Sequence, residues 1–216
     1  MTALNIFCEE SRADIWSDGA YLRPDGTLDS IASKVVVLGG VPAAVAVAGP
    51  SDLQLVVMLH LAARFASYDD LCDGAVEALR NHPFGDDRLT QSSFAWAGWS
   101  ERRQRITAHV VTSEGIPGGL EAWQRGEAWR FINPNPPQLV PGLARRGLDL
   151  LKPDAITEDE AASLMRAQRA LRMPLRETLG ESIVGGFMQH TVVTRDEIST
   201  RVVERWPDVI GQMIAA

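Results

Sequence analysis

The chain contains few residues that bind metal ions or form cross-links. Among its 216 residues there are only two cysteines, Cys8 and Cys72, and four scattered histidines. The cysteines form no CxxC pair, and no histidines cluster near them, so the spacing typical of a structural zinc site is missing. We therefore expect neither a metal centre nor a cofactor.

The sequence also lacks an excess of basic charge and a long apolar run. Lysine and arginine number 21 against 28 acidic residues, a net charge of -7, whereas a nucleic-acid partner requires a basic face. The run VVVLGGVPAAVAVAG contains glycine and proline and is too short to span a bilayer as a helix. The N-terminus has no basic segment followed by an apolar one, as a signal peptide would. These absences predict a cytoplasmic protein with reduced thiols, without a nucleic-acid or membrane partner.

The overall composition is that of a globular protein. Hydrophobic residues make up 45% of the chain and charged residues 23%, which are ordinary values for a soluble domain. A chain of this length buries a substantial core, and it contains no internal repeat and no low-complexity segment. We expect one domain that covers residues 1–216.

Local patterns predict the order of strands and helices. Alternating and continuously apolar runs predict strands, whereas capping residues and 3.6-residue periodicity predict helices. Expected strands cover residues 3–8, 12–17, 34–40, 42–49, 92–101, 105–115, 187–196 and 199–206. Expected helices cover residues 51–66, 68–80 and 156–172, with Ser51 as the N-cap of the first. Residues 18–30 are expected to form turns and loops, and residues 129–142 have no defined pattern.

This order of elements predicts the fold class. The two long helices follow one another instead of alternating with strands, which argues against a doubly wound parallel sheet. Nearly continuous apolar strands indicate sheets buried on both faces. We predict an α+β fold, a four-layer helix–sheet–sheet–helix sandwich of antiparallel sheets.

Four residues at regular spacing form a candidate catalytic group. Asp18 follows Thr2 by sixteen residues, Lys34 follows Asp18 by sixteen, and Gly49 follows Lys34 by fifteen. If the turn between the first two strands is centred on Glu10, Thr2 lies directly opposite Asp18, within about 4.5–5.5 Å. The alternation of the two strands does not fix this register, because apolar residues occupy even positions in one and odd positions in the other.

The chemistry of this group is specific. A threonine hydroxyl is a weak nucleophile that needs an adjacent base. Removal of Met1 would free the α-amine of Thr2, whose pKa near 7.7–8.0 suits a general base. The ammonium of Lys34 would lower the pKa of that amine, and Asp18 would orient Lys34. A backbone N–H near Gly49 would stabilise the oxyanion.

These residues resemble a known family. Thr2, Asp18 and Lys34 match the N-terminal threonine, aspartate and lysine of proteasome-type β subunits, and the pattern is most similar to the bacterial HslV-type protease. The segments DGAY, ASKVVVL, AVAGPSDLQLV and GESIVGGFMQHTVVTRD carry the similarity. The resemblance implies a four-layer N-terminal nucleophile hydrolase fold. It also implies cleavage of peptide bonds through an acyl-enzyme on Thr2, and a homo-oligomeric ring that takes peptide or unfolded-protein substrates. Whether an ATP-dependent unfoldase is a partner stays open.

The sequence departs from the family pattern at the groups that support the α-amine. Val184 replaces a serine before the Gly185–Gly186 pair, Glu181 replaces an aspartate, and no Ser-Gly-Gly turn occurs mid-chain. Two alternatives to a threonine peptidase therefore stay open. The first is an inactive ring or scaffold component, and the second is a small-molecule amidohydrolase of the same superfamily.

Three other residues offer weaker alternatives. Cys8 has the wrong spacing to Asp18 for a nucleophile of this kind, and it lies in an apolar alternation, which predicts a buried structural cysteine. Ser51 lacks the full G-x-S-x-G motif of a nucleophile elbow and is better explained as a helix cap. His60 lies in an apolar helical pattern and is interpreted as a core or interface residue rather than a base.

Overall fold

The structure of the chain is a computed structural model. It describes residues 2–49, 60–81, 92–115, 120–152, 155–175 and 178–215, and for residues 173–175 and 178–181 it describes the backbone alone. The strands before the first labelled helix are β1 (Leu4–Cys8), β2 (Arg12–Asp18), β3 (Ala20–Leu22), β4 (Leu28–Ile31), β5 (Val35–Val37) and β6 (Ala43–Ala48). Helix α2 (Tyr68–Arg80) precedes β7 (Ser93–Ser100), β8 (Arg105–Thr112), β9 (Gly126–Glu127) and β10 (Arg130–Asn133). Helices α3 (Leu139–Ala144) and α4 (Glu158–Arg169) precede β11 (Met173–Leu175), β12 (Thr178–Glu181), β13 (Phe187–Thr194) and β14 (Ile198–Arg205).

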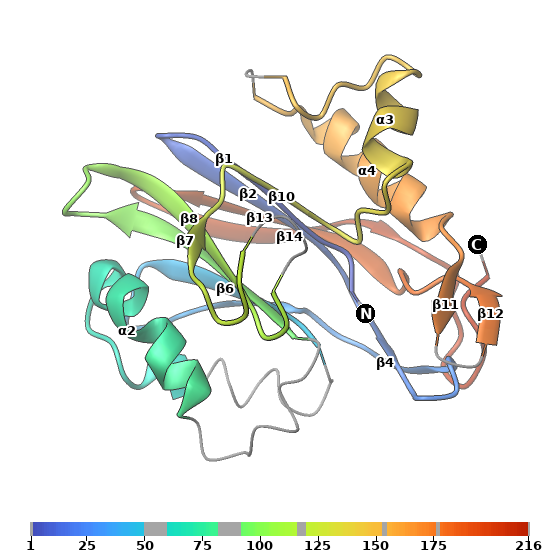
Figure 1. Ribbon diagram of the computed structural model, residues 1–216, viewed down its shortest axis with the longest axis horizontal. Coiled ribbons are helices and arrows are strands. Elements are labelled where there is room, and N and C mark those ends of the chain that lie inside the picture. Colours follow the sequence, from blue (N-terminus) through green and yellow to red (C-terminus); the bar gives the residue numbers. More distant parts are fainter. Residues whose placement is uncertain are drawn as a thin grey trace.

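Most strands belong to two antiparallel sheets. The first sheet has the order β10-β1-β2-β13-β14, and the second has the order β5-β6-β7-β8-β9. Two small hairpins, β3–β4 and β11–β12, lie beyond them. The two sheets face each other, and Figure 1 shows the N-terminal end of β1 near the centre of the molecule. The chain is therefore an α+β protein with antiparallel sheets.

The facing surfaces of the two sheets form one apolar cluster. The first sheet contributes larger side chains, among them Leu4, Ile6 and Ile15. The second sheet contributes a set of small side chains: Ala44, Ala46, Ala48, Ala95, Ala97 and Ala108. Alanines on one face leave room for the branched side chains of the other, so the two sheets can approach closely.

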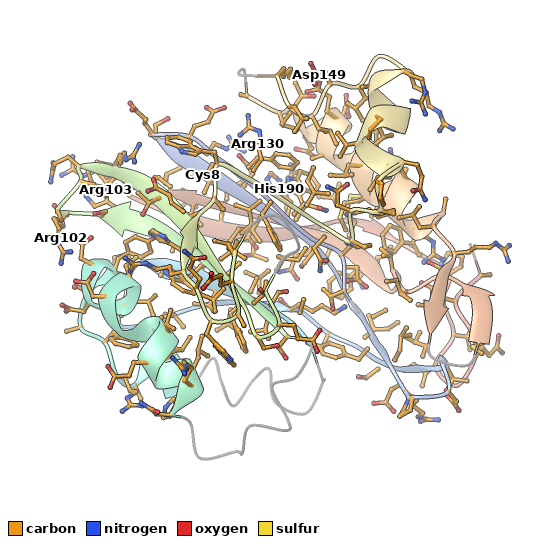
Figure 2. The ribbon with its side chains drawn as sticks, in the orientation of Figure 1. Cys8, Arg102, Arg103, Arg130, Asp149 and His190 are labelled. Carbon is orange, nitrogen blue, oxygen red and sulfur yellow. The ribbon has the colours of Figure 1, made fainter. Side chains whose placement is uncertain are left out.

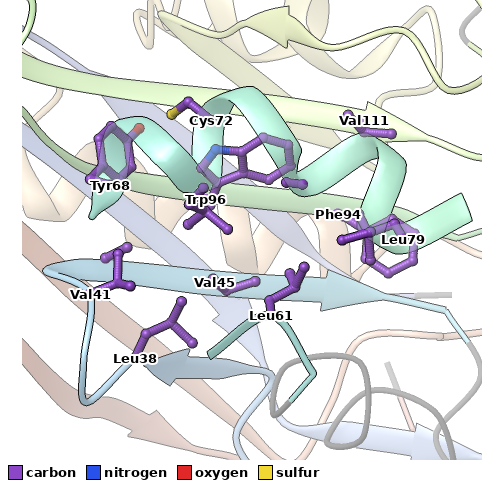
Figure 3. Packing of buried hydrophobic residues seen from close by; sticks show 14 of the residues in the cluster. Leu38, Val41, Val45, Leu61, Tyr68, Cys72, Leu79, Phe94, Trp96 and Val111 are labelled. Atoms are coloured by element: carbon purple, nitrogen blue, oxygen red, sulfur yellow. The ribbon is translucent and has the colours of Figure 1, made fainter. Parts of the chain in front are cut away.

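Each sheet also packs against helices on its other face. Under α2, the aromatic residues Phe94 and Trp96 of β7 belong to one apolar cluster with Leu71 and Leu79 of the helix. Figure 3 shows Phe94, Trp96 and Leu79 in this cluster. On the first sheet, Trp16 and Phe7 belong to a cluster with residues of α3 and α4. Figure 1 shows α2 on one side of the molecule and α3 with α4 on the other. Among the described residues, no helix has the length and apolar character needed to cross a membrane.

Several predicted elements are confirmed. The helix expected at 68–80 has the same bounds as α2, and it begins where the Ser67 hydroxyl accepts a hydrogen bond from the amide of Asp70. The helix expected at 156–172 is α4, closed at its start by a capping box between Thr157 and Glu160. The expected strands correspond to β1, β2, β5–β8, β13 and β14. The helix expected at 51–66 lies mostly outside the described residues, as does Ser51.

Two predictions need correction. Residues 18–30 are not only turns, because 20–22 and 28–31 pair as the hairpin β3–β4 across the Asp-Gly turn at 25–26. The register between β1 and β2 differs by one residue from the prediction. Leu4 pairs with Ser17, and the turn is a two-residue loop at 10–11 closed by Glu9 and Arg12. Extending this register places Asp18 opposite Ala3, so the prediction that Thr2 directly faces Asp18 is wrong.

Candidate active site

The carboxylate of Asp18 is the centre of the candidate site. Asp18 ends β2 and is fully buried. Its Oδ1 accepts hydrogen bonds from the Lys34 ammonium at 2.8 Å and from the Ala3 amide at 3.0 Å. Its Oδ2 accepts from the amides of Gly185 at 3.1 Å and Ala20 at 3.2 Å. Four donors on a buried carboxylate offset the loss of its hydration and fix its orientation.

Lys34 is the only charged partner of that carboxylate among the described residues. It directly precedes β5, and its side chain is as buried as that of Asp18. Burial lowers the pKa of Lys34 below its ordinary value, and the attraction of Asp18 opposes this effect. The ammonium also lies 5.2 Å from the centre of the Tyr21 ring, a cation–π contact. An amine with a lowered pKa suits a role in proton transfer.

Thr2 directly precedes Ala3, whose amide contacts this ion pair. Thr2 is buried. The amide of the next residue, Ala3, donates to Oδ1 of Asp18, the same atom that accepts from Lys34. The carbonyl of Thr2 accepts a hydrogen bond from Nδ2 of Asn133 at 3.2 Å. The structure thus brings the backbone at Thr2 and the Lys34 ammonium to one carboxylate, although through Ala3 and not through a direct Thr2–Asp18 pair.

A buried amide network fixes Asn133. Nδ2 of Asn5 donates to Oε1 of Gln168 at 2.7 Å, and Nε2 of Gln168 donates back to Oδ1 of Asn5 at 3.0 Å. The same Nε2 donates to the Pro134 carbonyl, and the Asn133 amide donates to Asn5 at 3.3 Å. The network joins β1, α4 and the segment after β10, and so it positions the side chain that holds the Thr2 carbonyl.

Gly49 directly follows β6, at the same end of the second sheet as Lys34. The amide of Val47, two residues earlier, donates to the Lys34 carbonyl. A Cβ on Gly49 would lie 2.5 Å from Oγ of Ser92, so packing alone favours glycine at this position. Within the described part of the chain no hydrogen bond joins Gly49 to Thr2, and its role as an oxyanion donor stays a prediction.

The turn before β13 completes the site from the far end of the chain. Gly185 donates to Asp18, and its own carbonyl accepts from the Gly19 amide at 3.0 Å. Behind the turn, Arg169 of α4 and Asp208 form a bidentate, largely buried ion pair. Arg169 also donates to the Val184 carbonyl at 2.8 Å, and Asp208 accepts from the Gly186 amide at 2.7 Å. This ion pair therefore holds the turn against the site.

Sequence reasoning missed three of these contributions. The Ala3 and Gly185 contacts use backbone amides, which no side-chain pattern reveals. Asn133 falls in the segment that had no defined pattern, where no serine motif could be placed. The Gly185–Gly186 pair was a usable signal, since two adjacent glycines before a strand indicate a close backbone approach.

Cys8, one alternative nucleophile, and His60, considered as a base, lie in other surroundings. Cys8 lies between the two sheets (Figure 2), and burial raises the pKa of its thiol to about 12, which leaves it unreactive. His60 is half-buried, and its Nε2 lies 2.8 Å from an Nη of Arg64, one helical turn away. Neither residue takes part in the group around Asp18.

Comparison with known proteins finds a similar fold among solved structures. No family model matches the sequence, and no curated protein matches it. Among solved structures, the chain is similar to a (Gly-1) mutant of Anbu from Hyphomicrobium sp. strain MC1. The TM-score is 0.65 over 94% of this chain and 88% of that chain, at 13% sequence identity. At this identity the likeness concerns the fold alone.

Proposed function

We propose that the chain is an N-terminal threonine hydrolase that cleaves peptide or amide bonds after removal of Met1. The observation that carries the proposal is the buried Asp18–Lys34 ion pair, which shares Oδ1 of Asp18 with the amide that directly follows Thr2. A buried lysine is costly to keep, and perturbed ionisable groups of this kind concentrate at functional sites.

The proposed reaction has two steps. The Thr2 hydroxyl attacks the substrate carbonyl while the free α-amine of Thr2 accepts its proton. The C–N bond then breaks, the amine returns the proton to the leaving nitrogen, and an ester on Thr2 remains. Water hydrolyses this ester by the same route in reverse. Lys34 lowers the pKa of the amine by repulsion, Asp18 orients Lys34, and an amide near Gly49 stabilises the oxyanion.

The proposal extends to the architecture and partners. Three apolar clusters, one between the sheets and one on each outer face, support a four-layer helix–sheet–sheet–helix sandwich in a single domain. The proteasome-like resemblance supports a cytoplasmic homo-oligomeric ring that acts on peptide or unfolded-protein substrates. The net charge of -7 supports the absence of a nucleic-acid partner.

The test is covalent labelling of protein shown by intact mass to begin at Thr2. A proteasome-type epoxyketone requires both the hydroxyl and the free amine, so wild type should gain one adduct per chain. Thr2→Ala should gain none, and Thr2→Ser, which keeps the hydroxyl, should retain labelling. Failure of correctly trimmed wild type to react would overturn the proposal.

A catalytically inactive ring or scaffold protein is the second candidate. Val184 stands where the family carries a serine, and its side chain is buried in the apolar cluster under α4. The proposed support of the α-amine is therefore missing at this position. Retention of Met1 in protein made by the native host would favour this candidate, because a blocked amine cannot act as a base. If labelling succeeds, comparing unfolded casein with small amides as substrates separates a peptidase from an amidohydrolase.

A further inference from the structure

The ammonium of Lys34 has more hydrogen-bond donors than partners. An ammonium carries three N–H groups, and in the described part of the chain this one makes a single hydrogen bond, to Oδ1 of Asp18 at 2.8 Å. The side chain is 1% exposed, so bulk water does not reach it. A cation buried in this way needs further favourable electrostatic contacts to keep its charge.

The ring of Tyr21 supplies such a contact. Tyr21 lies in the middle of β3, and the centre of its ring is 5.2 Å from Nζ of Lys34. The face of an aromatic ring attracts a cation within about 6 Å, and the attraction is stronger where the cation has lost its water. The ring therefore favours the charged form of Lys34.

The hydroxyl of Tyr21 contacts the backbone that carries Lys34. It donates a hydrogen bond to the carbonyl of Ser33 at 3.2 Å. The hydroxyl of Ser33 in turn donates to the Val35 carbonyl at 2.7 Å and accepts from the Val35 amide at 3.2 Å. The residues on the two sides of Lys34 are thus joined, and Tyr21 holds one of them.

Tyr21 acts on Lys34 as a neutral group. Burial, together with the nearby carboxylate of Asp18, raises the pKa of the Tyr21 hydroxyl to about 12, so it keeps its proton at neutral pH and is no second counterion. Among the described residues, Asp18 is the only charged group that acts on the pKa of Lys34. Burial lowers the pKa of Lys34, and the carboxylate opposes this effect. The ring acts in the same direction as the carboxylate.

We propose that Tyr21 is a positioning residue of the candidate site, whose ring stabilises the Lys34 ammonium and whose hydroxyl fixes the backbone before Lys34. This inference rests on the proposed function, in which the charge on Lys34 lowers the pKa of the Thr2 amine. Without the ring, Lys34 loses its proton at lower pH, and the Thr2 amine loses the repulsion that activates it. Tyr21 thus sets the upper limit of the pH range in which the site works.

The experiment measures the titration of Lys34 directly. The chain contains only two lysines, Lys34 and Lys152, so ¹³C labelling at lysine Cε gives two ¹H–¹³C correlations, which Lys152→Arg assigns. In Tyr21→Leu the acid dissociation constant of Lys34 should rise about threefold to tenfold. Lys152, which is partly exposed and pairs with Glu160, should titrate as in wild type and serves as the internal reference.

Epoxyketone labelling against pH supplies the second readout. The alkaline limb of the labelling rate should move to lower pH in Tyr21→Leu, because this limb follows the loss of the Lys34 charge. Tyr21→Phe keeps the ring and loses only the contact with Ser33. It should leave the titration of Lys34 close to that of wild type and slow labelling, and an unchanged rate would overturn the role of the hydroxyl.

Trp129→Leu is the matched control. It also removes a ring from a cation–π contact, since the Trp129 ring centre lies 5.0 Å from the Arg105 guanidinium. This contact is at the Cys8 end of β1, away from the N-terminus, and the Trp129 side chain is exposed. Trp129→Leu should leave the titration of Lys34 unchanged.

Two results would overturn the proposal for the Tyr21 ring. One is a titration of Lys34 that is the same in Tyr21→Leu as in wild type, and the other is an equal change in Trp129→Leu. The NMR titration needs no catalysis, so it separates this inference from the proposed function. Absence of labelling in correctly trimmed wild type would overturn the proposed function, whereas an unchanged Lys34 titration beside normal labelling would overturn the role of Tyr21 alone.

Discussion

The ammonium of Lys34 lies 2.8 Å from Oδ1 of Asp18, and the two side chains are 1% and 0% exposed. Both charges have lost their hydration, and their mutual attraction, the three backbone donors on Asp18 and the Tyr21 ring near Lys34 offset that cost. Removing either partner alone would leave a buried charge without its counterion. The pair is thus a stability element as well as the proposed catalytic group, and the two roles can be tested separately.

Lys34→Met should strongly destabilise the protein. Because the buried carboxylate of Asp18 would lose its charged partner, we expect a loss of about 3–5 kcal/mol in the free energy of unfolding, measured by urea titration. Arg23→Met is the matched control, since it breaks an ion pair with Asp29 whose side chains are 51% and 43% exposed. It should cost less than about 1 kcal/mol. Similar losses in both variants would contradict this account of Asp18.

Arg169→Met should weaken both the fold and the site. It leaves the largely buried Asp208 unpaired, with an expected loss of about 3 kcal/mol. It also frees the turn that carries the Gly185 amide to Asp18, so epoxyketone labelling should slow under conditions in which the variant is fully folded. On the same helix, the exposed pair Arg166–Glu204 offers the control. Arg166→Met should change neither stability by more than about 1 kcal/mol nor the labelling rate.

The sequence alone predicted much of the fold, because strong local patterns coincide with the final elements. Helix α2 and the β7–β8 hairpin follow from periodicity and turn residues that tertiary packing does not override. The hairpin β3–β4 was missed because proline and two Asp-Gly pairs dominate residues 18–30. Turn residues mark where a chain reverses but do not exclude short strands on either side.

The contact between Asp18 and Lys34 was predictable from the sequence, but the register that surrounds it was not. Asp18 and Lys34 meet as expected, yet Asp18 faces Ala3 because β1 and β2 are joined by a two-residue loop. Both faces of the first sheet are buried, so hydrophobic alternation could not distinguish registers that differ by one residue. The Gly185 contact joins segments more than 160 residues apart through a backbone amide, which no local pattern encodes.

Gly49→Ala should test whether this position is constrained by packing or by catalysis. The new Cβ would lie 2.5 Å from Oγ and 3.1 Å from Cβ of Ser92, so we expect a loss of about 1–3 kcal/mol. Adding Ser92→Gly removes the clashing atoms, and a double-mutant cycle should show most of that loss restored. The double variant keeps the Gly49 amide and should still react with the epoxyketone. Loss of labelling despite restored stability would show that packing alone does not explain the glycine at this position.

His109 should make the protein less stable in mild acid. Burial lowers the pKa of His109 to about 4, and the cations Arg125 and Arg103 add to this effect. The carboxylate of Glu127 partly opposes it. An unfolded histidine binds its proton near pH 6.5. Between these values the unfolded state holds more protons, so stability falls as pH drops from about 6.5 to about 4, by at most about 3 kcal/mol. His109→Gln lacks this titration and should show a flatter pH dependence in urea unfolding. Since the carboxylates titrate in both proteins, only the difference between the two curves reports His109, and parallel curves would contradict the prediction.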